Sequence, residues 1–288
     1  MKNFVPHLLS MTATPIPRTL ALTIYGDLDL SLIDTMPKGA RKVKTSLVSQ
    51  KDRERVYKLI AKEIKRKKQV FVICPRIEEK ELKEGQEDKS GWSEVKAVKE
   101  EYERLSKKIF PKFKLAMLHG KMSSTEKTQV MKNFRNKKID ILVSTSVVEV
   151  GIDIPDATIM VVEGAERFGL SQLHQFRGRI GRSGEQAHFF LFYNSHSRNA
   201  LARLRALAKI DNGLKLAEKD LAIRGAGQFL GTKQWGIPDI AMDALTNFSL
   251  VEDTRESAKE ILRQDPELKK SFNLKQRLKN FTQNIHLE

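Results

Sequence analysis

Residues 139–163 read IDILVSTSVVEVGIDIPDATIMVVE, and two apolar runs, 139–145 and 157–163, flank a polar turn that contains glycine and proline. Near-continuous apolar runs are typical of parallel strands that are buried on both faces of a sheet. This stretch therefore predicts two buried strands of a parallel sheet, joined by a polar segment at which one strand ends.

The same pattern continues on both sides of this stretch. Similar runs, predicted as strands, occur at 69–74, 114–119 and 186–193, with a weaker candidate at 43–48. Between them lie helical patterns at 52–67, 94–108 and 123–135, the last opened by a serine three residues before a glutamate, as in a capping box. This alternation predicts an α/β fold, with a mostly parallel sheet sandwiched by helices.

After residue 193 the pattern changes to helices alone. An amphipathic helix is predicted at 196–209 and a second at 214–223, which ends at the glycine-rich sequence RGAG. The two form a predicted helical hairpin appended to the sheet. The remainder from about residue 240 is predicted to be helical, and residues 80–90, which are rich in Glu, Lys and Gly, are predicted to form a mobile insertion.

The composition narrows the possible partners. The chain has 288 residues and a formal net charge of +16, which points to a polyanion such as nucleic acid or an acidic membrane, although an ordinary basic protein fits the charge as well. A hydrophobic content of 40% is enough for a core, which excludes wholesale disorder. The single cysteine, Cys74, excludes an intrachain disulfide framework and any cysteine-based zinc cluster. No apolar run approaches the ~18–20 residues of a membrane span, so we expect a cytoplasmic protein with no membrane partner.

The segment 175–182, QFRGRIGR, carries the strongest chemical signal. Arg179 and Arg182 lie three residues apart, on one face of a helix or helix end. The planar arginine fork suits bidentate contact with phosphate, and phosphoryl-transfer sites use such an arginine to neutralise developing charge. Taken alone, the segment fits a generic basic turn that binds any anion.

A second signal lies at the end of the strand predicted at 139–145. In open α/β sheets, ligands bind at the carboxyl ends of the strands. There, Ser144 and Thr145 can donate hydroxyl groups to a phosphate, Gly151 permits close approach, and Asp153 can orient a sugar hydroxyl or an arginine. A tight turn between strand and loop explains the same residues equally well.

Together these segments resemble a known family. TSVVEVGIDIP followed by QFRGRIGR resembles motifs V and VI of superfamily-2 helicases and translocases, and MTATP at 11–15 resembles their motif III. Residues 15–48 and 203–236 are similar to RecG-type branch-migration helicases, the second segment to their translocation hairpin. The resemblance covers about residues 7–240 and implies a RecA-like helicase C-terminal domain. It also implies four parts: a tail of the first motor domain and linker (1–40), the RecA-like domain (41–195), the hairpin (196–240) and a helical extension (241–288).

The resemblance also assigns roles to single residues. Arg179 and Arg182 would be arginine fingers that reach ATP, with Gln175 as their coupling partner. The residues on the nucleotide side, or bracing motif VI, would be Glu149, Gly151 and Asp153. The residues that contact DNA or couple it to the ATP cycle would be Thr12, Thr14, His119, Ser144, Thr145, Arg198, Arg203, Arg224 and Gln234. For the hairpin residues, a solvated helix face or a plain loop position is an equally good interpretation, and a histidine at a strand end is more often a turn residue.

One feature departs from the family pattern. The sequence contains no G-x-x-x-x-G-K-[ST] phosphate loop and no acidic magnesium motif before its Thr-Ala-Thr. We therefore expect the cofactors, ATP and Mg²⁺, to be bound mainly by a first motor domain outside this chain, and the chain alone to have negligible ATPase activity. The partners that the resemblance implies are branched or double-stranded DNA, the N-terminal motor and wedge domains, and single-stranded-DNA-binding protein.

Two alternatives remain open at this stage. A transcription-repair coupling translocase shares motifs V and VI and a similar hairpin. A non-enzymatic DNA-binding or docking module fits the missing phosphate loop, although such a module has no need of paired arginines. The resemblance favours an ATP-dependent DNA helicase that acts in fork reversal, branch migration, repair and recombination.

Overall fold

The computed structural model describes residues 9, 11, 43–75, 91–145, 154, 157–181, 185–195, 197–224 and 248–283. The predicted boundaries near residues 40 and 240 and the predicted insertion at 80–90 lie outside these residues. The described residues fall into two compact units, which divide between Leu216 and Ala217. The first holds the sheet, and the second holds α9 (Phe248–Gln264), α10 (Phe272–Gln283) and most of α7 (Gly213–Arg224).

The sheet of the first unit contains six described strands in the order β1-β6-β5-β2-β4-β3, and every described pairing is parallel. The strands are β1 (Lys44–Val48), β2 (Gln69–Ile73), β3 (Leu115–Leu118), β4 (Ile141–Ser144), β5 (Ala157–Val162) and β6 (His188–Phe192). The central strands β2, β4 and β5 are buried at every position, as their continuous apolar runs predict. The expected α/β fold with a parallel sheet is therefore confirmed, and the weak candidate at 43–48 is an edge strand.

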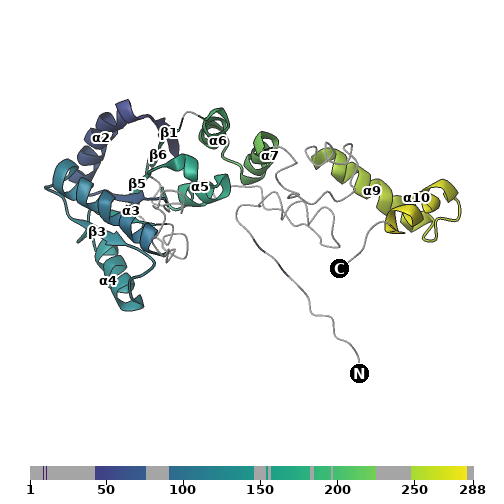
Figure 1. The fold of residues 1–288 in the computed structure, drawn as a ribbon, viewed down its shortest axis with the longest axis horizontal. Helices are drawn as coiled ribbons and strands as arrows, with labels where there is room; N and C mark the ends of the chain where they lie inside the picture. Colours follow the sequence, from purple (N-terminus) through teal and green to yellow (C-terminus); the bar gives the residue numbers. More distant parts are fainter. Residues whose placement is uncertain are drawn as a thin grey trace, which may run out of the picture. The chain divides into compact units, whose positions relative to one another are not determined.

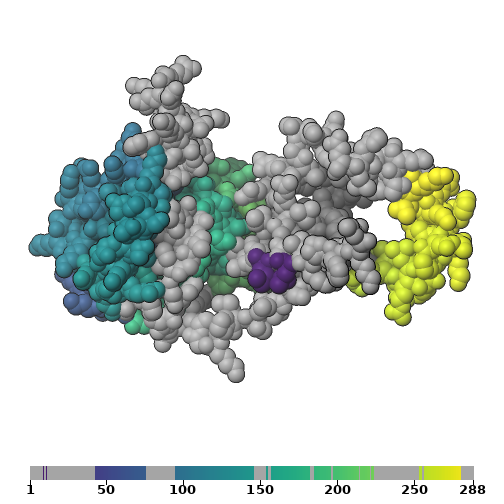
Figure 2. Space-filling model, turned by 90° about the horizontal axis from the view of Figure 1, so that it is seen from below, coloured from purple at the N-terminus to yellow at the C-terminus, as the bar shows by residue number. Residues whose placement is uncertain are grey.

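Described helices lie between most successive strands, as the crossovers of a parallel sheet require, and α6 follows the last strand. They are η1 (Gln50–Asp52), α2 (Arg53–Lys65), α3 (Gly91–Arg104) with its π-helical end η3 (Leu105–Ile109), α4 (Ser124–Arg135), η5 (Ala165–Arg167), α5 (Leu170–Arg177) and α6 (Arg198–Lys209). Figure 1 shows these helices arranged around the sheet, and in Figure 2 the blue-to-teal residues pack into one continuous body. The predicted capping box is present: the backbone N–H of Glu126 donates to Ser123 Oγ at 3.2 Å, and the Glu126 carboxylate accepts from the Ser123 backbone at 2.8 Å.

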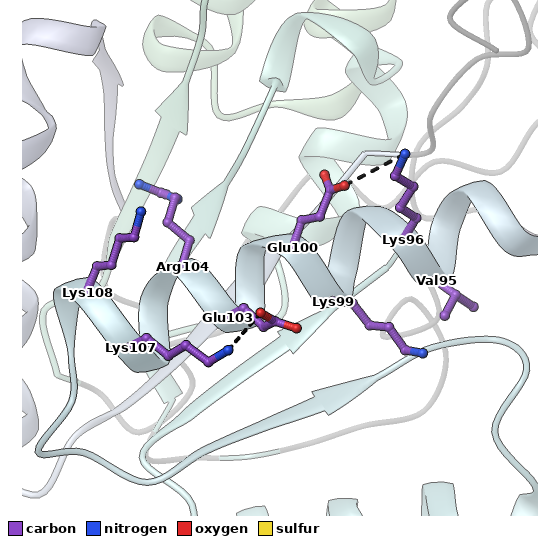
Figure 3. Close-up of a pocket in the computed structure, with 8 residues that line it drawn as sticks. All are labelled: Val95, Lys96, Lys99, Glu100, Glu103, Arg104, Lys107 and Lys108. Atoms are coloured by element: carbon purple, nitrogen blue, oxygen red, sulfur yellow. Dashed lines mark hydrogen bonds and ion pairs between the residues drawn. The ribbon is translucent and has the colours of Figure 1, made fainter. Parts of the chain in front are cut away.

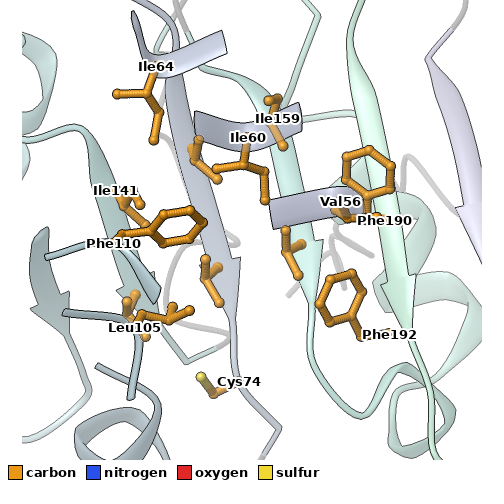
Figure 4. Packing of buried hydrophobic residues seen from close by; sticks show 14 of the residues in the cluster. Val56, Ile60, Ile64, Cys74, Leu105, Phe110, Ile141, Ile159, Phe190 and Phe192 are labelled. Carbon is orange, nitrogen blue, oxygen red and sulfur yellow. The ribbon is translucent and has the colours of Figure 1, made fainter. Parts of the chain in front are cut away.

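The core consists of two layers, one on each face of the sheet. On one face, Val56, Ile60 and Ile64 of α2 and Leu105 pack against alternate strand residues (Figure 4). On the other face, the Phe71 ring of β2 meets Phe134 of α4, with ring centroids 5.0 Å apart. Because side chains alternate along a strand, this arrangement buries both faces and leaves the strand ends as the place for polar groups.

Candidate functional site

The carboxyl ends of β3 and β4 bring three of the predicted site residues together. Ser144 ends β4, Thr145 follows it, and His119 follows β3. The Thr145 backbone N–H donates to the Leu118 carbonyl at 3.3 Å, which joins the two strand ends. Ser144, Thr145 and His119 have only 0%, 2% and 9% of their surface exposed. We call these three residues the strand-end cluster.

Two polar atoms of the strand-end cluster lack partners among the residues that the structure describes. Thr145 Oγ1 and His119 Nδ1 are buried and make no hydrogen bond there, whereas the Ser144 hydroxyl donates to the Thr145 carbonyl at 2.9 Å. A buried polar group without a partner costs about 1–3 kcal/mol, and an ordered water or a bound ligand can supply the missing hydrogen bond. The cluster therefore offers two unused polar atoms at the edge of the sheet where ligands of open α/β proteins bind.

The surroundings of the strand-end cluster are electropositive. Burial lowers the pKa of His119 below its ordinary value, and the charges of Lys99 and Lys127 lower it further against the opposing effect of Glu126. Lys127 Nζ donates to the Gly120 carbonyl at 2.6 Å, which holds this ammonium group beside the end of β3. His119 is therefore a neutral imidazole at neutral pH, within a field that attracts an anion.

The second predicted site, residues 175–181, lies at the end of α5. Phe176 and Ile180 are buried and anchor the segment, while Gln175 and Arg179 are half-buried. Gly178 ends the helix with a right-handed conformation, and the Arg179 backbone N–H donates to the Phe176 carbonyl at 3.0 Å. The helix end thus holds the backbone of Gln175 and Arg179 in one tight turn.

Gly181 closes this turn in a conformation that favours glycine. Its φ is +78°, in the left-handed region that L side chains rarely adopt, and a Cβ added there would lie 2.9 Å from Ala187 Cβ. The same added Cβ would lie 3.5 Å from Val43 Cγ2. The glycine therefore lets the chain that follows Arg179 and Ile180 pass close to the start of β6.

Arg177 is a functional candidate that the sequence analysis missed. Only 5% of it is exposed, and its guanidinium donates at 2.7–3.2 Å to the carbonyls of Leu207, Ile210 and Asp211 at the end of α6. Its Nη2 also donates to His174 Nδ1 at 2.9 Å. A signal was present in the sequence: Leu170, Leu173 and Arg177 follow helical spacing, which places the arginine on the buried face of α5.

The contact between Arg177 and His174 requires a neutral histidine. Burial lowers the pKa of His174 to about 4, and the neighbouring Arg177 charge contributes to the shift. Burial also lowers the pKa of Arg177, which stays protonated because its ordinary value is so high. The imidazole accepts a hydrogen bond while the guanidinium satisfies the terminal carbonyls of α6, so α5 and α6 are joined by a buried cation.

A second arginine makes the same connection from the other side. Arg203 of α6 is half-buried, and its Nη2 donates to the Phe168 carbonyl, two residues before α5, at 2.9 Å. This side chain is thus bound to the α5 region. The interpretation of Arg203 as part of a solvated helix face does not fit this contact. Arg198, at the start of α6, is exposed.

The remaining predicted site residues lie outside the described part of the chain. They are Thr12, Thr14, Glu149, Gly151, Asp153, Arg182 and Gln234, together with the side chain of Arg224. Among the described residues, no group of three or more His, Cys, Asp or Glu side chains is placed to hold a metal ion.

A buried ionic cluster, also missed, fixes the helices next to the strand ends. Glu163, directly after β5, pairs with Arg53 of α2 at 3.0 Å and with Arg104 of α3 at 3.3 Å. Arg104 also pairs with Glu101 at 2.6 Å and donates to the Tyr57 hydroxyl at 2.8 Å. Burial and the nearby Glu101 raise the pKa of Glu163 to about 7, against the effect of the two arginines. The cluster ties α2 and α3 to the end of β5.

The described sheet unit thus has the fold of a RecA-like helicase C-terminal domain, a parallel sheet flanked by helices. In agreement, residues 51–184 match the helicase conserved C-terminal domain family. Among the described residues, no helix is long and apolar enough to cross a membrane.

More specifically, the chain resembles the C-terminal part of the ATP-dependent DNA helicase RecG. It is 47% identical to RecG of Synechocystis sp. over 283 residues, which cover 96% of this chain and 32% of that protein. It is 46% identical to RecG of Aquifex aeolicus over 284 residues, which cover 96% of this chain and 34% of that one. A solved structure of RecG bound to a three-way DNA junction matches with a TM-score of 0.61 and 41% identity, over 83% of this chain and 30% of that one. The chain thus spans about a third of the length of these relatives.

Proposed function

We propose that this chain is part of an ATP-driven motor that moves along double-stranded DNA at branch points, as in fork reversal and branch migration. The observation that carries this proposal is the strand-end cluster, with two buried polar atoms in an electropositive setting. The likeness of the chain to RecG supports branched DNA as the substrate, because a structure of RecG bound to a three-way DNA junction exists. On this proposal the protein works on chromosomal DNA in the cytoplasm, and single-stranded-DNA-binding protein is a further partner.

At the strand-end cluster, Thr145 and His119 have the chemistry for a DNA phosphate. The Thr145 hydroxyl donates a hydrogen bond to a phosphate oxygen, and the neutral His119 ring donates through whichever ring nitrogen carries the proton. Within the described residues, Thr145 Oγ1 and His119 Nδ1 have no hydrogen-bond partner. Contacts of this kind hold the backbone and carry no base sequence information, which suits a motor that must act on any sequence.

The arginine segment has the chemistry for the phosphates of ATP. Arg179 and Arg182, held on either side of Gly181, supply the planar forks that neutralise charge on a transferring phosphoryl group, and Gln175 lies in the same turn. Glu149, Gly151 and Asp153 would lie toward the nucleotide. ATP and Mg²⁺ would be held mainly by a first motor domain, because the sequence has no phosphate loop; the nucleotide supplies the free energy of each step.

The two buried arginine contacts give the ATP side a mechanical link to the hairpin. Arg177 joins the end of α5 to the end of α6, and Arg203 joins α6 to Phe168, two residues before α5. A shift of the arginine segment on phosphate release is therefore transmitted to α6 as a rigid-body movement, because neither contact can stretch without exposing buried carbonyl groups. We propose that this link moves the hairpin, with Arg198, Arg224 and Gln234, along the duplex.

The proposal is tested by replacing Thr145 with valine, which keeps the shape of the side chain and removes its hydroxyl. Loss of a hydrogen bond to a charged phosphate, about 1.5–3 kcal/mol, predicts roughly 10- to 100-fold weaker binding to a three-way junction. The folded chain should be at least as stable as before, because an unsatisfied buried hydroxyl is removed. The matched control is Thr158→Val, which is equally buried but is the second residue of β5, at the opposite end of the parallel sheet from the strand-end cluster.

Three outcomes separate the possible functions. Weaker junction binding by Thr145→Val but not by Thr158→Val supports the proposal. Equal binding by both variants and the unchanged chain contradicts it. Capture of RNA polymerase, with no preference for junctions over linear duplex, would instead assign the chain to a transcription-repair coupling translocase.

A further inference from the structure

The outer face of α3 is a basic surface that the proposed function does not yet use. It borders a hollow of about 560 Å³ that is lined by residues of α3 and η3 (Figure 3). We call this surface the α3 face; its charged residues are Lys96, Lys99, Glu100, Glu103, Lys107 and Lys108. All six are exposed, and lysines outnumber glutamates two to one.

The α3 face is held rigidly on the sheet domain. On the opposite side of the helix, Val98 and Leu105 are 0% and 1% exposed and pack in the core. Arg104 is bound to Glu101 and, through Glu163, to the end of β5. A surface fixed in this way can bind a rigid partner without first paying the entropy of ordering a loop.

The glutamates of the α3 face do not neutralise it. Glu103 pairs with Lys107 at 2.9 Å and Glu100 lies 3.9 Å from Lys96, and such exposed pairs stabilise a protein by only ~0–1 kcal/mol. Within the described residues, neither Lys99 nor Lys108 has an acidic group within ion-pair distance. The two weak pairs are easily exchanged for phosphate contacts, since a lysine stem is long and flexible.

One lysine of the α3 face, Lys99, lies near the strand-end cluster. The helix packs against β3 and β4, the two strands whose ends form the cluster. Lys99 lies near enough to His119 for its charge to lower the pKa of that histidine. A polyanion bound at the strand ends therefore meets the lysines of α3 next.

The spacing of the lysines suits a duplex. Lys96 and Lys99 lie at one end of the face and Lys107 and Lys108 at the other, about ten residues further, which is ~15 Å at the helical rise. This separation is comparable with the ~12 Å width of the major groove of B-DNA. The two lysine pairs can therefore reach phosphates of the two strands on either side of a groove.

We propose that the α3 face is a second contact for the phosphate backbone of double-stranded DNA, continuing the path that begins at the strand-end cluster. This inference rests on the proposed function, since it extends the same DNA path. It adds the set of side chains that hold the second strand.

The experiment measures binding of the full chain to a 30-base-pair duplex as a function of salt concentration. One variant changes Lys96, Lys99, Lys107 and Lys108 together to glutamine. The matched control changes four exposed lysines of η1 and α2 to glutamine, and so removes the same charge: Lys51, Lys58, Lys62 and Lys65. A third variant carries arginine at the four α3 positions, which keeps the charge, and thermal melting checks that each variant is folded.

If each α3 lysine contacts one phosphate, the slope of log affinity against log salt should fall by about 2–4 in the glutamine variant. The control should keep its slope within about one, and the arginine variant should bind like the unchanged chain. Equal losses in the α3 variant and the control would overturn the inference, because only net charge would then matter. If Thr145→Val weakens binding while the α3 variant matches the control, only this inference fails. If the unchanged chain shows no salt-dependent binding, both proposals fail.

Discussion

Gly181→Ala is the substitution whose effect follows most directly from the geometry of the arginine segment. Gly181 has a φ of +78°, and an added Cβ would lie 2.9 Å from Ala187 Cβ, a distance that real Cβ atoms essentially never show. Either the backbone leaves the left-handed region or the start of β6 moves. Both responses redirect the chain between Arg179 and Arg182.

The cost has two parts. A non-glycine residue in the left-handed region costs about 1–2 kcal/mol, and overpacking against a buried neighbour costs about 1–3 kcal/mol. Together they predict a loss of about 2–5 kcal/mol, and a melting temperature lower by ~4–20 °C for a unit of this size. The neighbouring Gly178 is the matched control: its φ is −70°, and the nearest atom to an added Cβ is 3.5 Å away. Gly178→Ala should therefore leave the stability unchanged, or raise it by up to ~1 kcal/mol.

The assay is thermal unfolding of the chain followed by circular dichroism, with both alanine variants beside the unchanged protein. In a protein that joins this chain to a first motor domain, Gly181→Ala should also reduce DNA-stimulated ATP turnover by roughly 100-fold, because a displacement of about 1 Å is enough to do so at a catalytic site. Melting temperatures of the two variants within 1 °C of each other would refute the reasoning, because the positive φ and the close contact distinguish the two glycines.

Three further predictions follow from the site. Arg177→Leu should destabilise the chain by about 3–5 kcal/mol in urea unfolding, because the buried carbonyls at the end of α6 lose their donor; a loss below 1 kcal/mol would show that water replaces it. His174 has a folded pKa of about 4, below its ordinary 6.5, so its contribution to stability is complete above pH 6.5 and is lost as the pH falls toward 4. His174→Gln should flatten this part of the pH profile of the urea midpoint, and an unchanged profile would contradict the assignment. The chain by itself should show no DNA-stimulated ATP turnover in a phosphate-release assay. A rate typical of intact motors would contradict the division of the ATP site between two domains.

Local sequence patterns predicted much of the fold, because its strands and helices are locally encoded. Continuous apolar runs located β2, β4 and β5, and Ser123 with Glu126 located the start of α4. The order of the strands was not accessible in this way, since it depends on how distant segments pair. The paired residues Glu163 and Arg53 are 110 positions apart, and no local pattern relates them.

The candidate site was predicted unevenly for a related reason. Motif-like segments pointed to Thr145, His119 and Arg179, because each lies in a short stretch with a recognisable order of residues. Arg177 lies inside the same stretch, yet its partners are backbone carbonyls about 30 residues further on, and carbonyls leave no mark on a sequence. The basic face of α3 was equally hidden, because its lysines become a surface only when the helix is placed against β3 and β4.

The central claim is that the sheet domain contacts ATP through its arginine segment and binds DNA through the carboxyl ends of its strands. Its most direct test is Arg182→Ala in a protein that joins this chain to a first motor domain, with DNA-stimulated ATP turnover and affinity for a three-way junction measured on the same preparation. The claim predicts turnover lower by at least ~10³-fold, as for loss of an arginine finger, with junction affinity within threefold of the unchanged protein. Equal loss of turnover and affinity, or full turnover without the arginine, would contradict it.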